Sequence, residues 1–257
     1  MIDMKILDLL NAPTKAERLA NLREVLKTTE FPPMVPQYIN NHIHTTYSFS
    51  PYSPTAAVYA ARMEGLCTAG IIDHDSISGA REFLEAAAMV DMPVTLGMEC
   101  RVSMDGTRLE GRRTNNPDQG GVSYMTIQSV PHDKIDVLTE FFKPYQAARH
   151  ARNRKMIEKI NELCGVELDY DRDVLPLSMA AENGGVTERH LMYALALCLE
   201  KQVGRGEPMI EKLTAMGMQL SEKQKKLNAR RSKNKDALSG INSRSAELSL
   251  LEQKYAA

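Results

Sequence analysis

Residues 68–76 read Thr-Ala-Gly-Ile-Ile-Asp-His-Asp-Ser, a short apolar run that ends in charged residues. Two isoleucines and the absence of charge before Asp73 are typical of a strand buried on both faces. Helical patterns flank the run, over residues 56–66 and 78–90. The run therefore predicts a central strand between two helices, as in a βαβ unit.

The same alternation extends outward along the chain. Tyr38–Thr45 has the pattern of an earlier strand, and Met92–Met104 that of a later one. Ser53-Pro54 has the residue types of an N-cap followed by the first helical position. The order strand, helix, strand, helix, strand implies right-handed βαβ units and a parallel sheet. We therefore expect an α/β fold, with a barrel as one form of it.

The chain divides into three segments by composition. Leucines at helical spacing, interrupted by Pro13, predict an N-terminal helical extension over residues 1–36. Residues 37–203 are expected to form the α/β domain. In residues 204–257 Lys, Arg, Glu, Gln and Ser become dominant, which predicts a polar segment that is helical or flexible.

After the third strand the pattern changes to a polar excursion followed by helices. Asp105-Gly106 is a hairpin-type turn signal, and Val122–Val130 would return as a strand. His132–Cys164 has a mostly helical pattern, with a break expected near Pro144. Thr187 is placed to cap a further helix over residues 188–201.

Bulk properties exclude several classes of protein. The net charge of −1 gives no global electrostatic support for a nucleic-acid or membrane partner. Apolar runs such as Leu191–Leu199 are too short to span a bilayer, and residues 1–10 lack the basic start of a signal peptide. Four scattered cysteines without a C-x-x-C pair argue against a zinc ribbon and a disulfide framework, and favour the cytoplasm. The oligomeric state is left open.

His42 and His44 are the first candidates for chemistry. On a strand, residues i and i+2 point to the same side about 7 Å apart at Cα, so both imidazoles can bind one metal ion. Coincidence is the alternative, because six histidines in 257 residues produce such a pair by chance with a likelihood of roughly 0.14.

Asp73-His74-Asp75 follows the central strand at its C-terminal end, the edge where sites form in α/β sheets and barrels. His74 is a candidate metal ligand. For Asp75, capping of the next helix by it or by Ser76 is the favoured interpretation.

Glu99 stands at the end of the third strand, after Thr95-Leu96-Gly97-Met98. A carboxylate in an apolar strand is costly to bury unless it is paired or binds a metal. A salt bridge to Arg101 on the same strand face is the alternative. Three successive strand ends thus supply nitrogen and oxygen donors without sulfur, a set that suits Zn²⁺, Mn²⁺ or Fe²⁺ in a hydrolytic site.

These residues match three motifs in register: His42-Ile43-His44-Thr45-Thr46-Tyr47-Ser48, then Ile71-Ile72-Asp73-His74-Asp75-Ser76, then Gly97-Met98-Glu99. In this order they resemble the PHP (polymerase and histidinol phosphatase) superfamily. The match covers roughly residues 38–200. A looser fourth element, Thr187-Glu188-Arg189-His190, is similar to the R-P-H helix start of the family, and a solvated first-turn histidine is its alternative.

The resemblance implies a distorted (β/α)7 barrel, similar to a TIM barrel, with two or three divalent transition-metal ions (Zn, Mn or Fe) at the C-terminal strand ends. His42, His44 and Glu99 would share one ion, while His74 and His190 would hold others. Asp73 looks like a partner that orients an imidazole. The implied activity is hydrolysis of a phosphate mono- or diester by metal-activated water, on a small phosphorylated substrate.

The sequence also departs from the family pattern. Phe49, Ser50 and Pro51 occupy positions where many members have Asp or His, and Gln128 stands where a ligand histidine is common, with His132 as the nearest imidazole. The late D-x-H turn is missing, which implies an incomplete barrel in a fragment of a longer chain or in a degenerate relative.

Two further interpretations follow from these patterns. The alternative function is a degenerate or truncated PHP domain that serves as a non-catalytic structural or nucleic-acid-associated module. Arg112 and Arg113, near a glycine-rich loop, are candidates for binding the substrate phosphate, because arginine matches phosphate with two parallel hydrogen bonds. A solvated loop is the alternative for both. The catalytic residues are not predicted.

Overall fold

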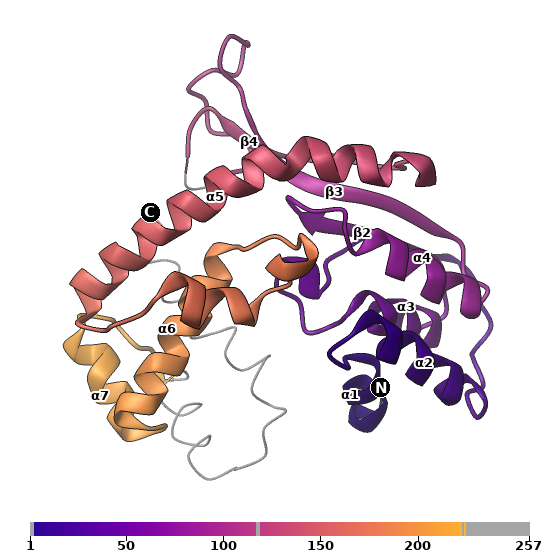
Figure 1. The fold of residues 1–257 in the computed structure, drawn as a ribbon, viewed down its shortest axis with the longest axis horizontal. Coiled ribbons are helices and arrows are strands. Elements are labelled where there is room, and N and C mark those ends of the chain that lie inside the picture. The colour runs from indigo at the N-terminus through magenta and orange to yellow at the C-terminus, as the bar shows by residue number, and fades with distance from the viewer. Residues whose placement is uncertain (1–2, 117–118, 223, 225–257) are drawn as a thin grey trace. The chain divides into compact units, whose positions relative to one another are not determined.

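The computed structural model describes residues 3–116, 119–222 and 224 (Figure 1). Strands and helices alternate from β1 to β3, as the sequence predicts, and β4 and, in the described part of the chain, three further α-helices follow. In chain order they are α1 (Met4–Leu10), α2 (Lys15–Leu26), β1 (Val35–Ile43), α3 (Pro54–Met63), β2 (Leu66–His74), α4 (Ala80–Met89), β3 (Val94–Ser103), β4 (Val122–Ile127), α5 (Ile135–Cys164), α6 (Glu188–Val203) and α7 (Glu207–Ala215).

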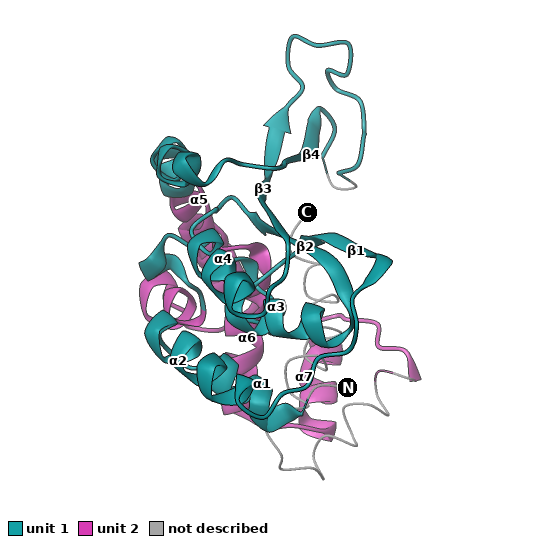
Figure 2. Ribbon diagram, turned by 90° about the vertical axis from the view of Figure 1, so that its right-hand side faces the viewer, with its two compact units in different colours: residues 1–147, 178–185 teal, residues 148–177, 186–257 magenta. Residues whose placement is uncertain are grey.

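The chain separates into two compact units, shown in different colours in Figure 2. The first comprises residues 1–147 and 178–185, and the second comprises residues 148–177 and 186–257. The predicted boundaries after residues 36 and 203 stay predictions. Within the predicted polar segment 204–257, residue 223 and residues 225–257 lie outside the described part of the chain.

A four-stranded sheet in the order β1-β2-β3-β4 forms the centre of the first unit. The first three strands are parallel, with Ile71 opposite Leu96 and His74 opposite Glu99. β4 runs antiparallel to β3, because the chain returns through a loop without a crossover helix. The α/β class and the parallel pairing of the first three strands are confirmed, β4 returns after the predicted turn, and the open sheet is consistent with part of a barrel.

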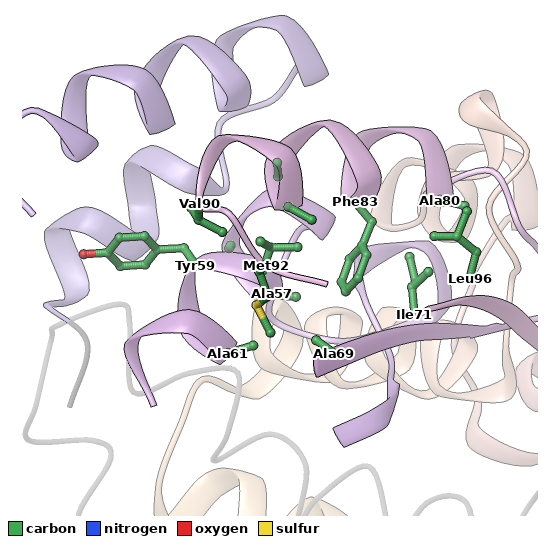
Figure 3. Packing of buried hydrophobic residues seen from close by; sticks show 14 of the residues in the cluster. Ala57, Tyr59, Ala61, Ala69, Ile71, Ala80, Phe83, Val90, Met92 and Leu96 are labelled. Atoms are coloured by element: carbon green, nitrogen blue, oxygen red, sulfur yellow. The ribbon is translucent and has the colours of Figure 1, made fainter. Parts of the chain in front are cut away.

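The core of the first unit lies between this sheet and the helices α3 and α4 (Figure 3). Ile71 and Leu96 meet the buried ring of Phe83, and small residues such as Ala57 let the helices approach the strands closely. Because side chains alternate along a strand, Gly97 and Glu99 point to the opposite face of the sheet from Leu96. The candidate ligand Glu99 is therefore kept off the helix-covered face.

Helix α5 runs without interruption through Pro144, so the predicted break is wrong. Proline removes one backbone hydrogen bond from a helix. Phe142 is buried before it and Ile157 after it, and packing on both sides holds the helix together. Among the described residues no helix combines the length and apolarity needed to cross a membrane.

A buried ion pair fastens α2 to α4. Arg18 Nε and Nη2 donate to the two carboxylate oxygens of Glu82 at 2.8 and 2.6 Å, and both residues are at most 2% exposed. Arg18 also donates to the carbonyls of Ala12 and Pro13, and Glu82 accepts from the amide and hydroxyl of Thr55. This network satisfies both charges, as a buried pair requires.

We expect Glu82→Ala to lower the free energy of unfolding by about 3–5 kcal/mol, because it leaves Arg18 buried without a counter-charge. The matched control is Glu85→Ala, which breaks the exposed pair between Lys15 and Glu85 (2.7 Å) and should cost less than about 1 kcal/mol. Urea unfolding of both variants checks this. Equal losses would show that Arg18 and Glu82 do not form the linkage described.

Candidate metal centre

Three of the predicted ligands meet at one point on the sheet. His42 Nε2 lies 3.0 Å from Glu99 Oε2 and 3.2 Å from His44 Nε2, and the last pair, His44 Nε2 and Glu99 Oε2, is 3.8 Å apart. Donor atoms that share an ion at 2.0–2.1 Å lie about 3.0–3.4 Å from one another at adjacent positions. The two separations from His42 Nε2 lie in this range and the third is 0.4 Å longer, so the two nitrogens and one oxygen are grouped as candidate ligands of a single ion.

The backbone explains why these side chains converge. His42 and His44 are two residues apart at the end of β1, and the register of the sheet brings Glu99 level with the end of β2. Gly97 lies on the same face as Glu99, where a Cβ would collide with the Ile127 carbonyl and stand 2.6 Å from Ile72 Cδ1. Only glycine fits there, which accounts for the first residue of the Gly97-Met98-Glu99 motif.

Asp73, at the end of β2, is 1% exposed and collects three hydrogen bonds. Its Oδ1 accepts from the Thr45 amide and the Ser48 hydroxyl, and its Oδ2 accepts from the Thr45 hydroxyl, all at 2.6 Å. Burial raises the pKa of Asp73 to about 6, and the three hydrogen bonds act against that rise. The carboxylate thereby holds the segment after β1 against the end of β2.

This network also selects the tautomer of His44. The Ser48 hydroxyl donates its hydrogen to Asp73, so its oxygen is left to accept from His44 Nδ1 at 3.3 Å. A proton on Nδ1 leaves the lone pair on Nε2, the atom that faces His42 and Glu99. Asp73 was predicted to orient an imidazole, and the structure places Ser48 between the two groups.

His74 lies beside the three donors. Its ring stacks on His44 with centroids 4.5 Å apart and an angle of 24° between the planes. Within the described part of the chain, the group of donors close enough to hold one ion comprises His42, His44 and Glu99 and does not include His74. A ligand role for His74 stays a prediction.

The residues that follow His74 do not cap the next helix. α4 begins at Ala80 with Gly79 as its N-cap and no side-chain capping bond, so the prediction that Asp75 or Ser76 caps it is wrong. Asp75 instead turns the chain at φ +54°, and its amide donates to the Glu99 carbonyl at 2.8 Å. The Ser76 hydroxyl donates to the Asn183 carbonyl at 2.6 Å.

Glu99 lies beside the imidazoles of His42 and His44, whereas the Arg101 side chain lies beside Tyr124 on the same face of the sheet. The Arg101 guanidinium lies over the ring of Tyr124, 5.7 Å from its centroid. Tyr124 is directly opposite Arg101 in the β3–β4 register, so both side chains leave the sheet on one side. The pairing of Glu99 with His42 and His44 replaces the salt bridge considered as its alternative.

His190 belongs to the second unit, on the first turn of α6. It is 1% exposed, and its Nδ1 accepts from the Thr187 amide at 3.0 Å in a capping box. Burial lowers the pKa of His190 to about 4, so the ring is neutral and carries its proton on Nε2. In this conformation His190 stabilises the helix start, and its role as a metal ligand stays a prediction.

The other candidates lie on exposed segments of the first unit. Arg112 and Arg113 are exposed on the loop between β3 and β4, where the Arg112 amide donates to the Leu109 carbonyl and the Arg112 carbonyl accepts from the Gly121 amide. Gln128 and His132 are exposed after β4. Their part in binding substrate or metal stays a prediction.

The part of α5 in the second unit carries arginines that form ion pairs. Arg152 pairs with Glu188 at 2.7 Å, and Arg154 pairs with Asp171 at 2.6 Å. Positive charge that is already paired gives little attraction for a nucleic-acid backbone.

No protein-family model matches the chain. Error-prone DNA polymerases of Mycobacterium bovis and Mycobacterium tuberculosis are 34% identical to it over 96 residues. That segment is 37% of this chain and 8% of each polymerase, so the chain corresponds to a small part of those proteins.

Two solved structures share the fold. A protein assigned as a metal-dependent phosphoesterase from Bifidobacterium adolescentis has a TM-score of 0.50 and 21% identity, over 75% of this chain and 58% of that one. An amidohydrolase from Chromobacterium violaceum, with sulfate and no metal bound, has a TM-score of 0.50 and 18% identity, over 72% and 55%. Both structures are under 25% identical to this chain, so the likeness shows a shared fold, which agrees with the predicted resemblance.

We expect Asp73→Ala to destabilise the protein by at least about 3 kcal/mol, since it leaves three buried donors of Thr45 and Ser48 unpaired. Asp73→Asn should cost about 2 kcal/mol less, because its carbonyl oxygen keeps two of those donors and the buried charge is removed. Urea unfolding at pH 7 compares the two variants. Equal losses would mean that the side-chain oxygens do not hold this segment.

The lowered pKa of His190 predicts a pH dependence. A group whose pKa is about 4 when folded and 6.5 when unfolded contributes stability above pH 6.5 that is lost as the pH falls toward 4. The loss is on the order of 3 kcal/mol. His190→Gln keeps the capping acceptor and should reduce this loss in urea unfolding at pH 7 and pH 4.5. An unchanged pH dependence would contradict the buried neutral ring.

Proposed function

We propose that the chain carries a metal-dependent phosphoesterase centre, in which His42, His44 and Glu99 bind one divalent transition-metal ion. The observation that carries this proposal is the spacing of the three donor atoms, all within 4.8 Å of one another at the ends of β1 and β3. The fold shared with a protein assigned as a metal-dependent phosphoesterase supports it. The proposed reaction is hydrolysis of a phosphate mono- or diester on a small substrate.

The donor set fits zinc, manganese or iron, because it joins two neutral imidazoles to one carboxylate without sulfur. When bound, such an ion supplies Lewis acidity and lowers the pKa of water. The single charge of Glu99 leaves a divalent centre with net positive charge, which attracts a phosphate ester. Ser48 and Asp73 keep the His44 nitrogen directed at the centre.

Several finer features belong to the same proposal. His74, stacked on His44, is the described residue of the first unit best placed to bind a second ion. A third ion at His190, phosphate binding by Arg112 and Arg113, and completion of the sheet into a (β/α)7 barrel are proposed on the strength of the motifs. The four cysteines are free thiols, which supports a cytoplasmic location.

The alternative is a non-catalytic structural or nucleic-acid-associated module. The observation in its favour is the 96-residue match to error-prone DNA polymerases. Metal content separates the two functions, because a hydrolase has to retain bound ions whereas a structural module does not depend on them.

The double variant His42→Ala, His44→Ala is expected to lose bound metal and keep its fold, since the core is apolar and the ligands lie apart from it. Elemental analysis after dialysis measures the metal, and circular dichroism measures the fold. Turnover of p-nitrophenyl phosphate and bis-p-nitrophenyl phosphate should fall at least 100-fold in parallel.

The matched control is His150→Gln, which removes a histidine of the second unit outside the donor group and should leave metal content unchanged. Metal content that survives the double change would refute the site. Wild-type protein that binds metal and hydrolyses neither ester would favour the non-catalytic module.

A further inference from the structure

Residues 178–185 form a short segment of the first unit that we call the strap. In the chain the strap stands between residues 177 and 186, which both belong to the second unit. Its hydrogen bonds join it to the two segments that begin at the candidate ligands His44 and His74, at the ends of β1 and β2. The strap therefore links both ligand-bearing strand ends to a part of the chain that is remote in sequence.

The first attachment of the strap is to Tyr47, three residues after His44. The Tyr47 hydroxyl donates to Glu182 Oε2 at 2.6 Å, and the Gly185 amide donates to the Tyr47 carbonyl at 2.7 Å. Tyr47 is 3% exposed. Because Tyr47 is held at its hydroxyl and at its carbonyl, the strap fixes the turn that contains Ser48, whose hydroxyl oxygen faces His44 Nδ1.

The second attachment is to the turn that follows His74. The Asn183 carbonyl accepts from the Ser76 hydroxyl at 2.6 Å and from Gln146 Nε2 at 3.1 Å. Gly185 passes so close to β2 that a Cβ on it would collide with the His74 carbonyl oxygen. The backbone of the strap is thus packed directly against the backbone of a candidate ligand, which only glycine permits at this point.

The two attachments act on the stacked imidazoles of His44 and His74, whose centroids are 4.5 Å apart. One ring follows β1 and the other ends β2, so the stack depends on how these two strand ends are oriented. Asp73 already links them through buried hydrogen bonds. A single linkage permits the ends to rotate about it, whereas the strap adds a second linkage that restricts this rotation. Such supporting contacts keep metal ligands in a binding geometry.

We propose that the strap is a positioning element of the candidate metal centre, with Tyr47 and Glu182 as its positioning residues. It acts through the backbone of the segments that carry His44 and His74. This proposal rests on the proposed metal centre and adds to it a contribution from residues 178–185. Loss of the bond between Tyr47 and Glu182 lowers metal affinity, because the imidazoles then occupy the binding geometry for a smaller fraction of the time.

The test measures the affinity of the 257-residue chain for Co²⁺, whose visible absorption reports the geometry of its ligands. Tyr47→Phe is expected to weaken Co²⁺ binding about tenfold and to change the absorption spectrum, because it removes the donor to Glu182. Glu182→Ala should have the same effect, whereas Glu182→Gln keeps an acceptor oxygen and should lose less affinity. Urea unfolding of each variant measures its stability separately.

The matched control is Tyr59→Phe, which removes the hydroxyl of another tyrosine that is 3% exposed and has a hydrogen-bond partner, Thr29 at 3.5 Å. Tyr59 lies on α3 in the apolar core, so Co²⁺ affinity and spectrum should stay those of the wild type. Wild-type affinity in Tyr47→Phe, or an equal loss in Tyr59→Phe, would overturn the positioning role. A loss in Glu182→Gln as large as that in Glu182→Ala would overturn it as well.

Hydrogen exchange of the metal-free protein separates failure of the strap from failure of the proposed function. The amides of residues 45–48 and 74–76 should exchange faster in Tyr47→Phe than in the wild type, and no faster in Tyr59→Phe. Unchanged exchange in Tyr47→Phe would show that the strap does not hold these segments, whatever the metal does. A wild-type chain that binds no Co²⁺ would instead refute the metal centre, and the positioning role with it.

Discussion

The buried carboxylate of Asp73 constrains the geometry on which the candidate centre depends. It has no cationic partner in its own hydrogen-bond network and is stabilised by one amide and two hydroxyl groups from the segment after β1. Those donors belong to Thr45 and Ser48, which flank the chain on either side of the turn that follows His44. If the carboxylate moved, the end of β1 would lose its attachment to β2, and His44 would lose the group that fixes its tautomer.

Because of this anchoring by Asp73, the two faces of the sheet have different roles. Asp73 and Ile71 lie on the side that packs inward, whereas His74 and Glu99 lie on the other. Alternation along β2 therefore lets one strand end supply both a structural anion and a candidate ligand. In the Asp73-His74 pair of the motif, Asp73 holds the backbone in place, and His74 lies on the face of the candidate centre.

Much of this arrangement could be predicted from the sequence, because it depends on periodicity. The i, i+2 spacing of His42 and His44 and the apolar run before Asp73 determine strand faces directly. The Ser53-Pro54 start of α3 was predicted for the same local reason, and the structure confirms it. Other features depend on tertiary contacts that local patterns do not contain. Pro144 remains within α5 because packing on both sides compensates for its missing hydrogen bond.

Local sequence patterns are also insufficient to predict the surroundings of His190 and Arg101. The sequence gives the helix start at Thr187 but not the burial that makes His190 a neutral capping group. For Arg101, the antiparallel register of β4 puts Tyr124 opposite it, and a single sequence cannot specify that register. The likenesses to a phosphoesterase and an amidohydrolase agree on the fold.

The link between Arg18 and Glu82 has a consequence for how the chain is made. The two residues are separated by 64 positions, and a ribosome adds about 5–20 residues per second. Arg18 is therefore synthesised roughly 3–13 seconds before its counter-charge. During that interval water solvates the Arg18 guanidinium, and the neighbouring side chains of Leu19 and Leu22, which are buried in the finished protein, lack the α4 surface that covers this region. The attachment of α2 through this ion pair can therefore form only after α4 has been synthesised.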